Sequence, residues 1–146
     1  MTPGSPRTLL LVALGGALGS VARYLTGLWL SPVSNGVMAG LPAGTLLVNV
    51  AGAFLIGLVL GWLPSSTGLD GAVPWLRALL AAGFCGGFTT FSALSAETLA
   101  LLSAGRTARA GAYVMLTLLL GLAATWIGLR LGAAMAVRSA RVLPLP

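Results

Sequence analysis

The sequence contains two acidic residues, one cysteine and no histidine among its 146 residues. Without histidine, Ser-His and Cys-His catalysis are excluded within one chain. One cysteine, Cys85, cannot build an intrachain disulfide framework or a zinc site. Any acid–base chemistry would depend on Asp70 and Glu97 alone. We therefore expect that the protein is not an enzyme.

Charge of either sign is scarce. Charged residues make up 7% of the chain, whereas a soluble domain carries about a quarter. Hydrophobic residues make up 58%. The net charge of +6 comes from arginines scattered between Arg7 and Arg141, and nucleic-acid binding would need a clustered basic patch with interleaved aromatics. The composition predicts a membrane protein and excludes a nucleic-acid partner.

Four apolar runs are long enough to cross a bilayer core of about 30 Å. They predict an all-α membrane protein made of one four-helix transmembrane domain over residues 1–146. A cleaved signal peptide is disfavoured, because the first run is long and contains Arg23. Ser31 and Pro32 end the first apolar run. The predicted spans cover approximately residues 9–30, 41–63, 74–103 and 108–137.

Arginine placement gives little orientation preference. Four spans put both chain ends on one side of the membrane. The arginines near span ends divide four to two between the sides, with Arg7, Arg77, Arg138 and Arg141 on one side and Arg106 and Arg109 on the other. This is a weak bias by the positive-inside rule. A chain with so little bias can insert both ways, which favours an antiparallel dual-topology homodimer.

Each span contains two glycines four residues apart. This spacing places both glycines on one helix face, where backbones can approach closely. Four such pairs predict a tightly packed assembly of helices. The pairs are Gly15 and Gly19, Gly57 and Gly61, Gly83 and Gly87, and Gly128 and Gly132.

The third run contains GFCGGFTTFS at residues 83–92, where paired glycines and consecutive threonines disfavour a helix. We predict a broken third helix. Freed carbonyls at membrane depth could hold a cation, and freed N–H groups an anion. The alternative is a continuous helix whose Thr and Ser hydroxyls bond to their own backbone.

Three stretches, residues 15–24, 44–54 and 83–97, resemble the Fluc (CrcB) family of fluoride channels. The resemblance implies antiparallel dual-topology dimers in the cell inner membrane, with two fluoride pores and a central structural sodium ion. It implies passive fluoride export that reduces cytoplasmic toxicity. Membrane lipid and a second copy of the chain would be partners. The family's sodium ligands are backbone carbonyls, which match Gly86 and Thr89 here.

Asn49 places an amide deep in an otherwise apolar helix. A polar group at that depth is costly without partners, so Asn49 is a candidate pore donor. The alternative is a hydrogen bond between helices. Thr45 lies one turn earlier on the same face.

The resemblance also implies phenylalanine ring edges along the pore, since the edge carries the positive part of the quadrupole. Phe91 matches the first family phenylalanine, but Leu94 occupies the second position. Either one edge suffices, or Phe88 or Phe54 contributes, or conduction differs. The remaining candidates are Ser92, Tyr113, Thr117 and Glu97 for the pore and Arg23 for its vestibule.

Several candidates keep a second interpretation. Tyr113 is alternatively an interfacial anchor, and Thr117 a hydroxyl bonded to its own helix. Glu97 either lines the pore or ties helices together. Arg23 is alternatively a snorkelling anchor. The competing function is a small proton-coupled multidrug exporter, although the first span lacks the carboxylate that such exporters need. A subunit that only packs against other membrane proteins would leave Asn49 unexplained.

Overall fold

The computed structural model describes residues 5–35, 40–63 and 73–142, and this part of the chain is helical with no strand. Four of its helical stretches are long and apolar enough to cross a membrane, at Pro6–Leu30, Ala43–Trp62, Pro74–Ser103 and Thr107–Arg138. The predicted all-α, four-span architecture is therefore confirmed. The elements are α1 (Pro6–Asn35), α2 (Ala43–Trp62), α3 (Val73–Arg77), the π-helical segment η1 (Ala78–Cys85), α4 (Gly86–Phe88), α5 (Phe91–Ser103) and α6 (Thr107–Val142).

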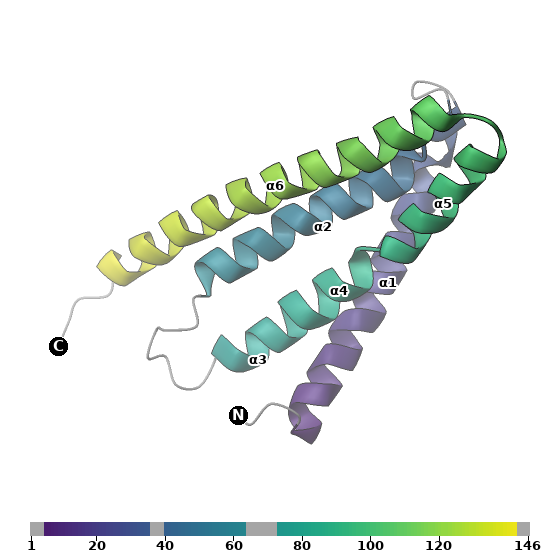
Figure 1. Ribbon diagram of the computed structural model, residues 1–146. Helices are drawn as coiled ribbons and strands as arrows, with labels where there is room; N and C mark the ends of the chain where they lie inside the picture. The colour runs from purple at the N-terminus through teal and green to yellow at the C-terminus, as the bar shows by residue number, and fades with distance from the viewer. Residues whose placement is uncertain (1–4, 36–39, 64–72, 143–146) are drawn as a thin grey trace.

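Successive spans run in opposite directions, so α1 begins and α6 ends at the same end of the bundle (Figure 1). The third span consists of α3, η1 and α4 in one continuous rod, followed by a break and then α5. The helices associate as two close pairs. One pair is α2 with α6, and the other is α1 with η1 and α4.

Glycines form both of these pairings, as their spacing predicts. In the first pair, a Cβ atom at Gly57 or Gly61 would clash with the backbone of α6, at Thr125 and Leu129 respectively. Gly128 and Gly132 meet the backbone of α2 in the same way. The two helices thus touch backbone to backbone, which only glycine permits.

The second pair uses the remaining glycines. A Cβ at Gly15 or Gly19 would clash with the backbone of the third span, and one at Gly87 would clash with Gly16. Gly83 lies against Gly15, whose Cα would be 2.9 Å from an added Cβ. The first helix therefore lies directly on the rod that ends at the break.

The first apolar stretch ends at Leu30, whereas helix α1 itself continues to Asn35. Proline holds a helical φ and removes only one backbone donor, so a last turn can continue past it. The helix therefore ends a few residues beyond its apolar stretch.

The turn between α5 and α6 is built by Gly105, which has a φ of +72°. Its N–H donates to Leu102 at 2.9 Å, and Arg106 N–H donates to Leu101 at 2.9 Å. These two bonds form a Schellman motif, which satisfies the last carbonyls of α5 and requires a residue in the left-handed region. The following helix therefore reverses direction within a few residues.

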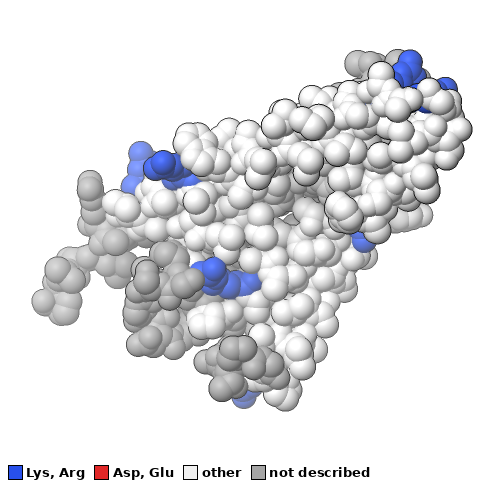
Figure 2. Space-filling model, viewed as in Figure 1, with Lys and Arg blue, Asp and Glu red and all other residues white. Residues whose placement is uncertain are grey.

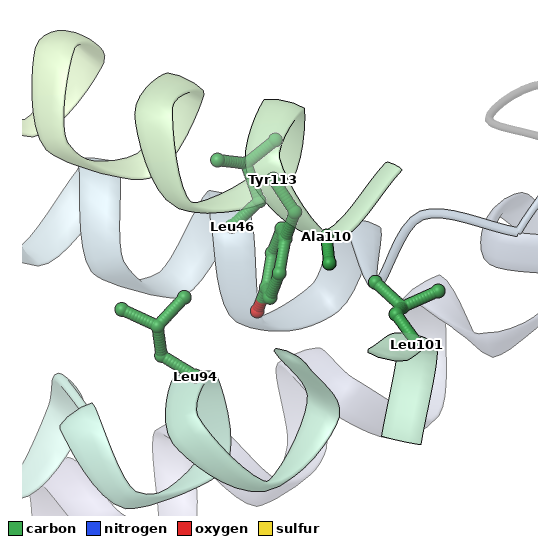
Figure 3. Packing of buried hydrophobic residues seen from close by; sticks show 5 residues of the cluster. All are labelled: Leu46, Leu94, Leu101, Ala110 and Tyr113. Carbon is green, nitrogen blue, oxygen red and sulfur yellow. The ribbon is translucent and has the colours of Figure 1, made fainter. Parts of the chain in front are cut away.

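A small buried cluster joins α2, α5 and α6 near this turn. Its members are Leu46, Leu94, Leu101, Ala110 and Tyr113 (Figure 3). Most other large apolar side chains point outward, including Trp29 and Leu122. The surface in Figure 2 is accordingly almost entirely uncharged, with arginines gathered mainly toward the two ends of the bundle. Such a surface suits lipid or a second protein chain, not water.

Candidate functional site

The break in the third span lies at Thr89 and Thr90, which both have extended backbone. Thr89 caps the C-terminal end of α4, and Thr90 caps the N-terminal end of α5. Thr89 Oγ1 donates to the carbonyl of Cys85 at 2.9 Å. Thr90 Oγ1 accepts from Ala93 N–H at 3.1 Å and so caps the start of α5. The consecutive threonines therefore stabilise the interruption, and the continuous-helix alternative is wrong.

Asn49 of α2 forms hydrogen bonds to the backbone of Thr90, in the break, through both polar atoms of its side chain. Its Oδ1 accepts from Thr90 N–H at 2.7 Å, and its Nδ2 donates to the Thr90 carbonyl at 3.1 Å. The interhelical bond considered from the sequence is thus present. An amide carries two N–H hydrogens. One of them is left without an acceptor in the described part of the chain.

The break also removes helical donors from several carbonyls, including those of Gly86 and Thr89. In a continuous helix, Gly86 would accept from Thr90 N–H, which here donates to Asn49. Thr89 would accept from Ala93 N–H, which here donates to the Thr90 hydroxyl. These two carbonyl oxygens have the chemistry of ligands for a hard cation.

The carbonyl of Gly87 is satisfied from α1. Arg23 Nε donates to it at 3.2 Å, and Ser20 Oγ donates at 3.5 Å. A cation is favourable at the C-terminal end of a helix, and α4 ends one residue later at Phe88. Arg23 is half-buried, and its hydrogen bond to the Gly87 carbonyl stabilises the chain next to the break. Its place in the sequence did not indicate this role.

Glu97 of α5 connects three helices. Its Oε1 accepts from Thr45 Oγ1 of α2 at 2.8 Å, and its Oε2 accepts from Tyr113 of α6 at 2.5 Å. Tyr113 is fully buried. Thr117, one turn further along α6, donates to the Tyr113 carbonyl at 2.8 Å. The helix-tying interpretation of Glu97 and the own-helix interpretation of Thr117 therefore both describe this structure.

The first turn of α5 has one outward and one inward side. Phe91 is 79% exposed, whereas Leu94 is 6% exposed and packs in the buried cluster (Figure 3). Ser92 is also exposed, and its hydroxyl lies 3.1 Å from that of Thr90. Phe91 and Leu94 are three residues apart on one helix, yet within one chain they differ sharply in environment.

A small cavity of about 120 Å³ connects several of these groups. Polar side chains of α1, α2 and the break border it. Its lining consists of Arg23, Gly27, Gly44, Thr45, Val48, Thr90 and Ala93. The cavity thus places an arginine and two threonines around one space between the helices.

Gly52 lies beside the break on α2, one turn after Asn49. A Cβ atom there would clash with the Thr89 side chain and lie 3.2 Å from the Phe88 ring. The glycine therefore lets the break approach α2 closely enough for the Asn49 hydrogen bonds to form. Four features thus converge at one point: an interrupted helix, an amide clamp, freed carbonyls and a guanidinium brace.

Comparison with known proteins decides the family. Residues 10–129 match the family described as CrcB-like protein, Camphor Resistance (CrcB). The chain belongs to the CrcB family. It is accordingly a multi-pass membrane protein, as its four apolar helices indicate.

Three relatives named "Fluoride-specific ion channel FluC" show how much of this CrcB-family chain is shared. The protein of Thermus thermophilus is 50% identical over 127 residues, which cover 86% of this chain and 94% of the relative. That of Flavobacterium psychrophilum is 43% identical over 123 residues, covering 84% and 94%. That of Anaeromyxobacter dehalogenans is 50% identical over 118 residues, covering 81% and 89%. All three names describe ion channels, and none describes an enzyme.

Sequence reasoning missed Ser20 and the bracing contact of Arg23. The available signal was the spacing of Ser20 and Arg23, which lie three residues apart and so share a helix face with Gly16 and Gly19. That face is the one that packs on the third span. A polar side chain at the edge of a glycine-lined contact is close enough to reach a neighbouring backbone.

Proposed function

We propose that this chain is a fluoride channel that lets fluoride leave the cell passively across the inner membrane and so reduces fluoride toxicity in the cytoplasm. The observation that carries the proposal is 43–50% identity, over more than four-fifths of the chain, to relatives named fluoride-specific ion channels. An interior-negative membrane potential drives an anion outward without any coupled ion. A channel therefore suffices for export.

Fluoride must exchange its water shell for protein donors without being trapped. The second amide hydrogen of Asn49 supplies such a donor while the first hydrogen holds Thr90. The Phe91 ring offers the positive edge of an aromatic quadrupole. Its 79% exposure leaves this ring free to face an ion path. Thr45, Ser92, Tyr113, Thr117 and Glu97 complete the proposed pore, with Arg23 at its vestibule. Leu94, the sixth candidate, packs in the buried cluster behind them.

We assign the carbonyls of Gly86 and Thr89 to a structural sodium ion. Support comes from the break, which diverts the N–H groups of Thr90 and Ala93 away from these two oxygens. In the described part of the chain no cluster of three or more acidic, histidine or cysteine side chains competes as a metal site. Two chains would supply four carbonyls. The ion would neutralise their converging dipoles.

The proposed assembly is an antiparallel homodimer with two pores. Its support is the four-to-two division of arginines and the large apolar area that one chain leaves open. A second copy would cover exposed side chains such as Phe91 and place the two breaks near each other. Each pore would then combine groups from both chains.

Reconstitution into liposomes tests the function. Vesicles loaded with fluoride are diluted into fluoride-free buffer without a pH gradient, and a fluoride electrode records efflux after valinomycin sets the potential with potassium. We expect efflux that requires valinomycin and moves net charge. Electroneutral efflux that requires protons would refute the channel and favour a proton-coupled exporter. Replacing sodium by N-methylglucamine should abolish the flux if the carbonyl assignment is right.

Cysteine-labelling from both sides of the membrane tests the orientation. We expect a single cysteine introduced at the turn after α5 to be labelled from both sides in a mixed population. Labelling from one side only would rule out the dual-topology homodimer while leaving the fluoride test above unaffected.

A further inference from the structure

Two arginines converge at the end of the bundle where α5 turns into α6. A Cβ atom at Gly40 would lie 2.9 Å from Arg109 Nη1 and 3.1 Å from Arg106 Nη1. The two guanidinium nitrogens are therefore at most about 6 Å apart. Both side chains are exposed and line an open depression of about 630 Å³. Figure 2 shows one of several groups of basic atoms at this end of the molecule.

No carboxylate in the described residues balances this pair. The only acidic side chain there is Glu97, whose two oxygens accept from Thr45 and Tyr113. The position is also unfavourable for cations, because Arg106 and Arg109 flank the N-terminal, positive end of α6. An anion between them would offset both effects.

Three other arginines have partners within the chain. Arg23 donates to the Gly87 carbonyl and Arg77 to the Leu63 carbonyl, while Arg130 lies over the Trp126 ring at 5.4 Å. In contrast, Arg106 and Arg109 share a space that faces outward. Gly40 makes this arrangement possible, since its φ of +92° and its missing side chain leave room for both guanidinium groups.

We propose that Arg106 and Arg109 together bind the phosphate group of an anionic membrane lipid. Because the two nitrogens are at most about 6 Å apart, one phosphate oxygen can lie about 3 Å from both, which is hydrogen-bonding distance. The planar guanidinium group suits phosphate. The third apolar span ends at Ser103 and the fourth begins at Thr107. Arg106 lies just before the fourth span and Arg109 lies in its first turn, so both are at headgroup depth. A lipid phosphate therefore reaches the site from the adjacent bilayer.

Native mass spectrometry of the purified full chain tests this proposal. The protein is released from nanodiscs that contain equal amounts of phosphatidylglycerol and phosphatidylcholine, and the retained lipids are counted. We expect preferential retention of phosphatidylglycerol. Each arginine near a membrane surface contributes roughly a fivefold change in affinity, so the double variant R106Q/R109Q should bind this lipid roughly 20-fold to 30-fold more weakly.

Two further variants separate the site from general charge. R138Q removes one exposed positive charge at the opposite end and should keep the preference, whereas R109Q alone should weaken it about fivefold. Gly40→Ala keeps every charge but intrudes between the guanidinium groups, and it should also weaken the preference. The unfolding temperature in phosphatidylcholine nanodiscs checks that each variant remains folded.

Equal loss in R138Q and R109Q would overturn the proposal, because charge alone would then explain retention. Undiminished retention by R106Q/R109Q would overturn it as well. A third arm adds inorganic phosphate to protein in phosphatidylcholine alone. Binding of this ion at Arg106 and Arg109 without any preference for phosphatidylglycerol would refute the lipid as the ligand. None of these outcomes depends on fluoride transport.

Discussion

Replacing Asn49 with leucine removes both hydrogen bonds between α2 and the break. Thr90 N–H, 2.7 Å from Asn49 Oδ1, loses its acceptor in a residue that is 8% exposed. An unsatisfied buried N–H costs about 1–3 kcal/mol, and the lost bond to the Thr90 carbonyl adds about 0.5–1.5 kcal/mol. We expect Asn49→Leu to lower the free energy of unfolding by about 2–4 kcal/mol, measured by equilibrium unfolding in mixed micelles.

The same variant should reduce fluoride flux at least tenfold in the liposome assay, since a hydrogen bond to a charged group is worth about 1.5–3 kcal/mol. Asn49→Asp keeps an acceptor for Thr90 N–H but removes both donors. Its free energy of unfolding should therefore be closer to that of the unmodified chain than that of Asn49→Leu is. It should still fail to conduct fluoride. Thr125→Val is the matched control, because its hydroxyl bonds only to Gly121 of its own helix.

Unchanged stability together with unchanged flux in Asn49→Leu would refute both roles of the side chain. Loss of stability with normal flux per folded protein would leave Asn49 as a clamp alone. Measuring both quantities on one preparation separates these results.

Further variants test the packing. Gly128→Ala should lower the free energy of unfolding by about 1–3 kcal/mol because its Cβ meets the backbone of α2, whereas Gly111→Ala on the same helix has open space and should be neutral or stabilising. Tyr113→Phe should lower it by about 1–3 kcal/mol, since Glu97 loses a donor. Leu94→Phe adds volume to the buried cluster and should lower it by about 1–3 kcal/mol without raising flux. Thermal or denaturant unfolding of each purified variant checks these values, and an unaltered midpoint for Gly128→Ala would contradict the backbone contact.

The number of spans and the helix faces that touch were predictable from the sequence, but the pairing of the helices was not. Four apolar runs fixed the number of spans, and glycines at a spacing of four marked a close contact on each one. The spacing could not say which helix meets which. Gly57 meets α6, while Gly15 meets the third span, because partners are set by the loops and by the fit of whole helix faces.

The break was predictable, but its construction was only partly so. Consecutive glycines and threonines indicated where helical bonding stops. The sequence could not show that Asn49 clamps Thr90, since the residues are 41 positions apart and meet only after α2 packs near the third span. The π-helical segment before the break has no sequence signal that we identified. The segment packs against α1.

Phe91 and Leu94 show where helix periodicity stops being informative. Residues three apart differ by about 60° around a helix, so both belong to one broad face. The boundary between the buried interior and the surface nevertheless falls between them. Leu94 packs with Tyr113 and Leu46, whereas Phe91 remains 79% exposed among the described residues. Only the packing of α2 and α6 sets this boundary. Leu94, where this chain departs from the family pattern, is thus a core position within one chain. Phe91, one turn earlier, is the exposed ring that a second copy or an ion can reach.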